Sequence, residues 1–252
     1  MKSKAAQAIG FYSKWLSKSS LGPIFWRLSR AQLRELIRAH PGDDAASIKA
    51  IADQYKGYGY YVRLHPFQVA QEYERLLSFA RSIKPGVIVE IGTADGGTLL
   101  GWCRIARDVV VSVDQPLNIY NWGYAPVRQR LYREMCRDRP QLKLHLIFGD
   151  SHAESTKKTV QDRLGSRTAD LLFIDGDHSY AGVRRDYELW RDLVRPGGYI
   201  VLHDIVPHAR KGVHKSEVDR LWVELKQTEK CSEIVADPAQ GWAGIGIIQT
   251  PG

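Results

Sequence analysis

Acidic and histidine side chains follow two hydrophobic runs in the second half of the chain. The first run is followed by Asp175-Gly176-Asp177-His178 and the second by His203-Asp204. Two carboxylates and an imidazole can bind a divalent cation, and the imidazole shifts the preference from magnesium toward manganese, iron, cobalt or zinc. We therefore predict a metal site made by Asp175, His203 and Asp204. In the structural alternative Asp177 caps the next helix and His203 packs or forms a supporting hydrogen bond.

His178 lies three residues after Asp175 and would stand beside such a cation. An imidazole titrates near neutral pH, so it can remove a proton from a substrate hydroxyl. A cation on the same oxygen would stabilise the alkoxide that forms. We therefore predict His178 as the catalytic base, with a histidine that merely begins a helix as the alternative.

A glycine-rich turn and separate acidic residues indicate a nucleoside ligand. The turn EIGTADGGT spans residues 90–98, and its glycines would let a ligand approach the backbone at the start of a helix. Asp114 lies 22 residues beyond Gly92, a separation at which an acid accepts hydrogen bonds from ribose hydroxyls. Asp150 and Ser151 follow a third hydrophobic run and would bond an adenine edge or cap a helix. Because the glycine spacing is not G-x-G-x-x-G, the nucleoside need not be a dinucleotide.

Alternating strands and helices must position these residues. β-Branched or hydrophobic runs predict strands at 87–91, 109–113, 142–148, 171–174 and 199–202, with two closing strands near 234 and at 245–248. Helices are predicted over about 67–80, 98–105, 126–138, 153–163, 179–193 and 216–227. Such alternation gives right-handed crossovers and a mainly parallel sheet with helices on both faces, so the fold class is α/β. All the candidate residues fall at carboxyl ends of strands, where these sheets bind ligands.

Composition narrows the class of protein. The chain has 252 residues, of which 44% are hydrophobic and 25% charged, and it contains no apolar run long enough to span a membrane. Three scattered cysteines form neither a disulfide framework nor a zinc pattern, which predicts a cytoplasmic protein. Residues 1–40 hold eight Lys and Arg against one Glu, a net of +7 out of the total of +8. The remainder is nearly neutral, so we expect no nucleic-acid partner.

Residues 1–60 are predicted to form a basic helical extension in front of an α/β domain at 61–252. Apolar residues over 5–16 recur with helical spacing among lysines, and a second helix is predicted between Gly22-Pro23 and Pro41-Gly42. Three interpretations stay open: docking on the domain or on a partner subunit, contact with an anionic membrane surface, and a targeting presequence. The first allows a homo-oligomer, and the second places a cytoplasmic protein at the membrane periphery.

Four strings make residues 60–250 similar to a known family. They are VEIGTADGGT, FIDGDHSY, LVRPGGYIVLHDI and GWAGIGII, in this order. With them the chain resembles the class I S-adenosylmethionine-dependent O-methyltransferases, most of all the branch of macrolide-sugar O-methyltransferases and cephalosporin-hydroxylase-like proteins. The resemblance implies a Rossmann-like, doubly wound sheet of seven strands. Residues 1–60 have no counterpart in it.

The resemblance also implies how the cofactor would be held. The turn after the first strand would hold the methionine part of S-adenosylmethionine, the acid after the second strand its ribose, and the pair after the third strand would lie near its adenine. The predicted cofactor-binding residues are therefore Glu90, Gly92, Thr93, Gly96, Gly97, Asp114, Asp150, Ser151 and Asp175.

In the same branch a metal of the magnesium or manganese type is held by an acid after the fourth strand and a residue pair after the fifth. Asp175 and the pair His203-Asp204 occupy these places. The usual pairs are Glu-Asp or Asp-Asn, so His203 departs from the pattern and leaves the identity and presence of the metal open. His178 matches the general base of the sugar-modifying members.

We therefore predict an S-adenosylmethionine-dependent O-methyltransferase that acts on a hydroxyl of a sugar or a similar small-molecule or glycan acceptor, assisted by a divalent cation. Tyr120, Trp122 and Tyr124 are predicted to form a lid over the acceptor, and residues 206–214 the opposite wall. Three alternatives stay open: a nucleoside-binding member of the fold without catalysis, a metal-independent methyltransferase and an RNA-directed methyltransferase. The sequence does not name the acceptor.

Overall fold

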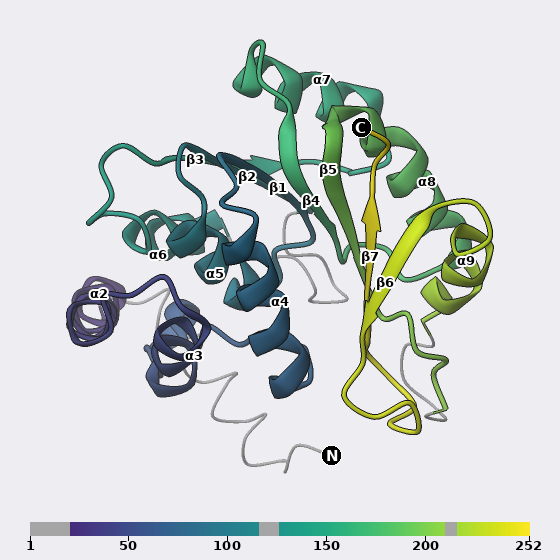
Figure 1. Ribbon diagram of the computed structural model, residues 1–252. Coiled ribbons are helices and arrows are strands. Elements are labelled where there is room, and N and C mark those ends of the chain that lie inside the picture. Colours follow the sequence, from purple (N-terminus) through teal and green to yellow (C-terminus); the bar gives the residue numbers. More distant parts are fainter. Residues whose placement is uncertain (1–20, 116–125, 210–215) are drawn as a thin grey trace.

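A seven-stranded sheet runs through the molecule, with helices on both of its faces (Figure 1). The computed structural model describes residues 21–115, 126–209 and 216–252. The strand order is β3-β2-β1-β4-β5-β7-β6, in which β7 runs antiparallel to β5 and β6 and the other pairs are parallel. The predicted α/β, mainly parallel sheet is therefore confirmed.

The elements alternate along the chain as the hydrophobic pattern predicts. The strands are β1 (Val87–Ile91), β2 (Val109–Asp114), β3 (Lys143–Phe148), β4 (Ala169–Ile174), β5 (Val194–His203), β6 (Lys230–Ile234) and β7 (Ile245–Gln249). The α-helices described are α2 (Gly22–Ala39), α3 (Ala45–Gln54), α4 (Ala70–Ser82), α5 (Gly97–Ile105), α6 (Gln129–Glu134), α7 (Glu154–Leu164), α8 (Tyr180–Trp190) and α9 (Val218–Leu225).

Each face of the sheet has its own hydrophobic core, because successive side chains of a strand point to opposite faces. Ile88 and Val110 pack into the cluster that contains α2 to α5. Their neighbours Val89 and Val111 pack into the cluster that contains α7, α8 and α9. The central strands are therefore buried on both faces, as their nearly unbroken hydrophobic runs indicate.

The strand order reverses beside β1, which places the candidate residues together. β1 pairs with β2 on one side and with β4 on the other, and β4 pairs with β5. In a parallel sheet the carboxyl ends of these strands lie at one edge, and a crevice opens where the order reverses. The segments that follow β1, β2, β4 and β5 are therefore neighbours.

Three elements differ from the sequence prediction. α3 is not predicted, although Asp44 accepts a hydrogen bond from Ser47 N in a regular N-cap. α6 ends at Glu134 rather than near 138, and a 3-10 turn precedes it because the buried Arg128 side chain donates to the carbonyls of Tyr60 and Val62. β5 begins at Val194 instead of 199, and its register with β4 shifts across the glycine turn.

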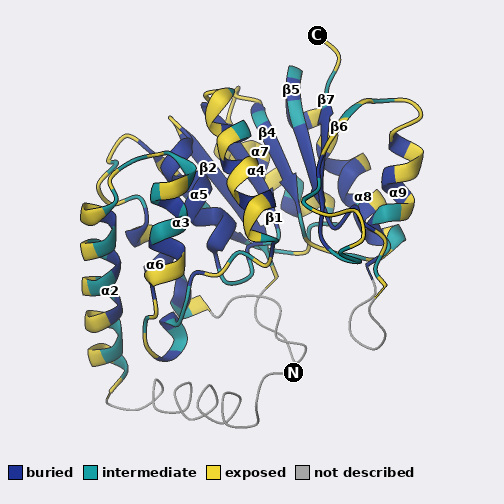
Figure 2. Ribbon diagram, turned by 60° about the horizontal axis from the view of Figure 1, so that its bottom comes forward, coloured by how far each residue is buried: buried dark blue, intermediate teal, exposed yellow. Residues whose placement is uncertain are grey.

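The described part of the extension packs on the domain (Figure 2). Leu33 of α2 and Ile48 and Ile51 of α3 are fully buried in the same cluster as Leu76 of α4. The outer face of α2 stays exposed along its length. Over the described ranges no helix is both long and apolar enough to cross a bilayer. The predicted first helix within 1–20 lies outside the described residues, and the domain boundary at residue 60 stays a prediction.

Candidate functional site

The glycines of the turn between β1 and α5 lie against neighbouring segments of the protein, which occupy the space where a side chain would stand. A Cβ on Gly92, which has a φ of 93°, would overlap the carbonyl of Asp175. A Cβ on Gly97 would overlap the backbone of Pro66, and one on Gly96 would meet the ring of Tyr132. The sequence predicts that these glycines let a ligand approach, whereas in the structure neighbouring segments occupy the space where their side chains would stand.

Asp114 binds this turn from the end of β2. Its Oδ2 accepts hydrogen bonds from the backbone N–H groups of Thr93 and Ala94, at 3.0 and 2.8 Å. Burial raises the pKa of Asp114 to about 6, although these N–H groups favour the charged form. The predicted ribose acid and the predicted methionine turn are therefore joined directly, which orders both without any ligand.

Glu90 lies beneath the turn rather than on its surface. Its side chain is fully buried, and it accepts hydrogen bonds from Trp102 Nε1 at 2.8 Å and from Ser112 Oγ at 2.5 Å. Ser112 in turn bonds the hydroxyl of Thr93. Burial raises the pKa of Glu90 to about 8, against the opposing effect of these donors. Glu90 thus supports the turn from below, and its contact with a cofactor stays a prediction.

The pair after β3 does not cap a helix with its side chains. Asp150 is exposed, and its Oδ1 accepts from the N–H of His152 at 3.0 Å. The carbonyl of Ser151 accepts from Trp190 Nε1, and α7 begins after Ala153 with no side-chain cap. Capping, one of the two interpretations of this pair, is therefore not observed, and adenine binding stays a prediction.

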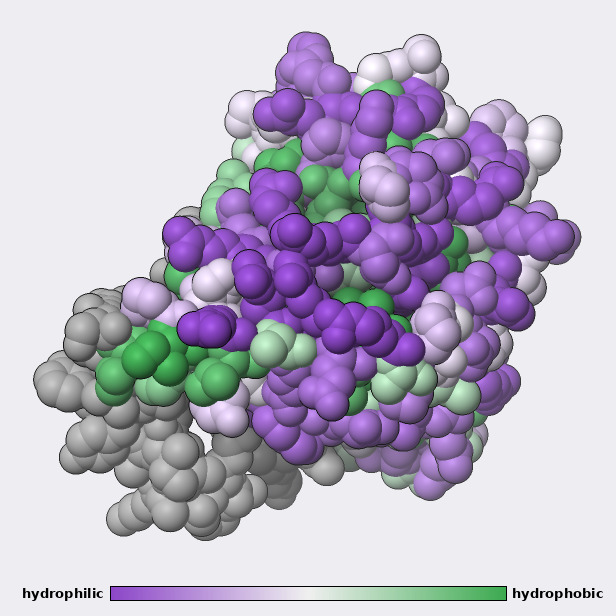
Figure 3. Space-filling model, turned by 90° about the vertical axis from the view of Figure 1, so that its left-hand side faces the viewer, coloured by the Kyte–Doolittle hydropathy of each residue, from purple (hydrophilic) through white to green (hydrophobic). Residues whose placement is uncertain are grey.

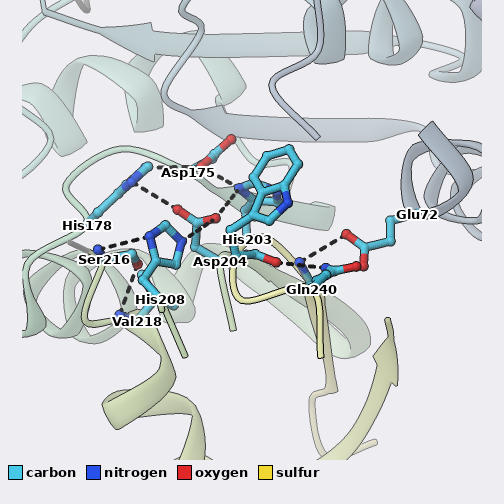
Figure 4. Close-up of polar contacts among 11 residues, drawn as sticks. Glu72, Asp175, His178, His203, Asp204, His208, Ser216, Val218 and Gln240 are labelled. Atoms are coloured by element: carbon cyan, nitrogen blue, oxygen red, sulfur yellow. Dashed lines mark hydrogen bonds and ion pairs between the residues drawn. The ribbon is translucent and has the colours of Figure 1, made fainter. Parts of the chain in front are cut away.

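The predicted metal and base residues form one cluster where β4 and β5 end (Figure 4). His203 Nδ1 lies 3.1 Å from Asp175 Oδ1 and 3.4 Å from Asp204 Oδ1. His178 lies between the two carboxylates, with Nε2 at 3.2 Å from Asp175 Oδ1 and Nδ1 at 3.1 Å from Asp204 Oδ2. The convergence predicted from adjacent strands is present, with His178 at its centre.

The cluster is a network of opposite charges. Burial alone would raise the pKa of Asp175 and Asp204, but the imidazoles hold both below the ordinary value. The carboxylates raise the pKa of His203 to about 9 despite its burial, and they raise that of His178 well above its usual range. Asp204 has a φ of 66°, a strained conformation that turns its side chain toward the histidines.

This arrangement tests the predicted cation. The donor types suit a divalent ion, because two carboxylates and an imidazole lie together. Their arrangement does not, since the carboxylate oxygens already face imidazole nitrogens at hydrogen-bond distance. Within the ranges described, no three His, Cys, Asp or Glu side chains are placed so that they could hold a metal ion. The cation therefore stays a prediction of the sequence.

Two histidines near the site were not predicted as members of the cluster, although His208 falls in the predicted acceptor wall. His208 Nε2 lies 3.4 Å from Asp204 Oδ1, and its Nδ1 accepts from the N–H of Ser216 at 3.5 Å. His152 Nε2 lies 3.6 Å from Asp186, a fully buried acid whose pKa burial raises to about 6. His208 is four residues beyond Asp204. The sequence alone does not place it in the cluster, because that placement depends on the path of the loop between them.

The walls predicted for the acceptor are only partly described. Tyr120, Trp122 and Tyr124 lie outside the described residues, as do 210–214. The described part of the second wall is a backbone ladder, in which Val206 N donates to Ala243 O and Ala209 N to Gly241 O. The loop on the far side of this ladder is held by Glu72, which accepts from Gln240 and from the N–H of Gly244 (Figure 4).

Comparison with known proteins agrees with this geometry. The family described as "Methyltransferase domain" matches residues 89–205, the stretch from β1 to the end of the cluster. Residues 89–205 therefore match a methyltransferase domain. This match confirms the methyltransferase that the four strings predict. The match covers the turn, Asp114, Asp150 and the Asp–His cluster together.

Solved structures share the fold over nearly the whole chain. An O-methyltransferase from Bacillus cereus, in complex with SAH, is 15% identical, with a TM-score of 0.52 over 97% of this chain and 99% of that one. A Staphylococcus aureus protein described as a caffeoyl-CoA O-methyltransferase is 16% identical, with a TM-score of 0.52 over 88% of this chain and 99% of that one. The methyltransferase domain thus has the Rossmann-like fold of this enzyme class.

A curated protein is similar to this chain over a short segment. It is the uncharacterized protein R132 of Acanthamoeba polyphaga mimivirus, which is 54% identical over 35 residues. The match covers 14% of this chain and 16% of that protein.

Proposed function

We propose that the methyltransferase domain transfers the methyl group of S-adenosylmethionine to a hydroxyl of a sugar or a similar small-molecule or glycan acceptor. One observation carries the proposal: the backbone of Asp175, whose side chain binds His178, lies directly against Gly92 of the predicted cofactor turn. A base and a methyl donor bound in these places would therefore be adjacent. The solved relatives that are O-methyltransferases support the choice of an oxygen acceptor.

In the proposed reaction His178 takes the proton of the acceptor hydroxyl. The oxygen attacks the sulfonium methyl, an O–C bond forms as the C–S bond breaks, and S-adenosylhomocysteine leaves. Because the attack needs oxygen, carbon and sulfur in line, most of the acceleration should come from positioning. Asp175 and Asp204 face both ring nitrogens of His178, so the acceptor hydroxyl must displace one of these carboxylates before the neutral ring can take its proton.

The test is turnover of S-adenosylmethionine carrying a labelled methyl group against a panel of glycosides, other polyols and phenols. We expect label in an ether product from at least one hydroxyl compound, and calorimetric binding of S-adenosylhomocysteine. Binding of the nucleoside without turnover of any acceptor would favour the non-catalytic alternative. Transfer to RNA in place of the small acceptors would favour the RNA-directed one.

A metal-independent reaction is the variant that the structure favours. Asp175 and Asp204 already have imidazole partners. We therefore expect the transfer rate to stay within about twofold after treatment with a chelator and gel filtration. This change is small, because about 1.4 kcal/mol corresponds to a tenfold change. Elemental analysis of the treated protein is the control. Loss of activity that manganese or magnesium restores would instead establish the site predicted at Asp175, His203 and Asp204.

The ionisation of Asp114 should control the affinity for the cofactor. Because its pKa is raised to about 6, the free protein loses this charge as the pH falls below 6, and a ribose hydroxyl binds a charged acceptor more strongly. We expect the dissociation constant for S-adenosylhomocysteine to rise by up to about tenfold per pH unit below 6 and to be flat above 7.

Asp114→Asn should weaken binding by about tenfold or more at pH 8 and remove this pH dependence, as isothermal calorimetry would show. Asp162→Asn is the matched control, because Asp162 is an exposed acid on α7. An Asp114→Asn variant that binds as tightly as the parent protein would exclude Asp114 from the cofactor site.

A further inference from the structure

The exposed surface of α2 carries a row of arginines and, beside it, a pair of apolar side chains. Arg27, Arg30, Arg34 and Arg38 recur at intervals of three and four residues, so they share one side of the helix and line one shallow hollow. The buried residues Leu33 and Ile37 directly precede Arg34 and Arg38, so the arginine stripe lies on the flank of the helix beside its buried face. Arg27 and Arg38 are the exposed members of the stripe, whereas Arg30 and Arg34 are partly buried.

Apolar side chains border the arginine stripe at the first two turns of α2. Ile24 is 51% exposed and Leu28 is 45% exposed, whereas the apolar residues of the core are almost completely buried. Ile24 precedes Arg27 by three residues and Leu28 by four, so the apolar pair and the arginines are adjacent. Figure 3 views the molecule from the side of α2 and shows a hydrophobic patch beside a mainly hydrophilic surface.

The combination of charge and exposed aliphatic surface distinguishes between partners. Residues 21–40 carry four Arg and one Glu, a net of +3, which complements an anionic surface. Nucleic acid would satisfy the arginines but gains nothing from exposed isoleucine and leucine. A bilayer with anionic headgroups satisfies both, because the aliphatic side chains enter the acyl boundary while the arginines bind phosphate.

We propose that the outer face of α2 docks the protein on an anionic lipid bilayer, with Ile24 and Leu28 inserted and Arg27 and Arg38 on the headgroups. Arg34 is held by an ion pair with Glu134, and Arg30 lies over the ring of Trp26, so the proposal assigns the lipid contacts to the other two arginines. Docking would leave the helix in place on the domain, since its buried face is unchanged. The proposal is independent of the methyl-transfer reaction.

The test is co-sedimentation of the full chain with vesicles of phosphatidylcholine alone or of phosphatidylcholine with phosphatidylglycerol. We expect binding only to the anionic vesicles and a decrease as salt is raised. Arg27→Glu/Arg38→Glu and Ile24→Ser/Leu28→Ser should each lower the partition coefficient by about tenfold or more. Lys158→Glu/Lys230→Glu is the matched control, because it changes the net charge equally at exposed sites on α7 and β6.

Circular dichroism and S-adenosylhomocysteine binding show whether each variant is folded. Equal binding to both kinds of vesicle, or equal loss in the control, would overturn the proposal. So would anionic binding that neither α2 variant changes. A dimer of the free chain that Ile24→Ser/Leu28→Ser dissociates, or RNA binding that Arg27→Glu/Arg38→Glu abolishes while vesicle binding persists, would assign the face to another partner.

Discussion

Replacing His178 by glutamine is expected to lower the turnover number for methyl transfer by about 10²–10⁴-fold, the usual contribution of a positioned general base. Glutamine can still bond the carboxylates of Asp175 and Asp204, so the cluster should stay folded, but it cannot accept a proton. The affinity for S-adenosylmethionine should stay within about threefold, since His178 is not among the predicted cofactor contacts. Steady-state rates with an acceptor from the panel, beside calorimetry, measure the two effects separately.

The pH profile gives this prediction a second readout. The carboxylates raise the pKa of His178 well above its ordinary value, and only the neutral ring can accept a proton. The rate of the parent protein should therefore rise with pH through the neutral range, whereas the residual rate of the variant should lack this dependence. His145→Gln, on the half-buried histidine of β3, is the control. A His178→Gln variant with a rate near that of the parent would exclude the base assignment.

Glu90→Gln is expected to change the pH dependence of folding stability more than any other single substitution proposed for the turn. The pKa of Glu90 is about 8 in the folded protein and about 4.3 in an unfolded chain. Between these values the folded protein holds a proton that the unfolded chain has released, so the free energy of unfolding falls as the pH rises. Glutamine can accept from Trp102 Nε1 with its oxygen and donate from its amide nitrogen to the hydroxyl of Ser112, but it has no proton to lose.

The stability of the variant relative to the parent should therefore increase with pH, by at most about 1.4 kcal/mol per unit and by roughly 4 kcal/mol between pH 5 and 8. Urea unfolding of the free protein across this range measures the difference. Glu188→Gln is the control, because Glu188 is an exposed acid on α8. A difference that does not vary with pH would show that Glu90 is charged throughout.

The backbone architecture was predictable because it follows from local patterns. Hydrophobic runs of strand length that alternate with helical periodicity leave few topologies other than a mainly parallel sheet, so β1 to β4 fall within two residues of their predicted places. The pairing of β4 with β5 brings Asp175 beside His203 for the same reason. Each of these residues stands at or directly after the end of its strand, so the order of the strands in the sheet is enough to bring their side chains together.

The glycines show where sequence reasoning reached the right position for a different reason. Gly97 is required because the backbone of Pro66 passes over it, and Arg128 is buried because it binds the carbonyls of residues 60 and 62. Both contacts join segments that are more than thirty residues apart. No local pattern contains such information, because the partners are brought together only by the tertiary packing of the segment around residues 60–66.

What the sequence determined by itself is the class of fold, the edge of the sheet where chemistry-bearing residues gather, and the methyltransferase family. Only the tertiary structure decided how those residues are paired. His178 lies between Asp175 and Asp204, and Glu90 lies under the turn instead of on it. The physical reason is that residue type and strand order set which groups meet, whereas burial and the orientation of side chains set their hydrogen bonds and their charges.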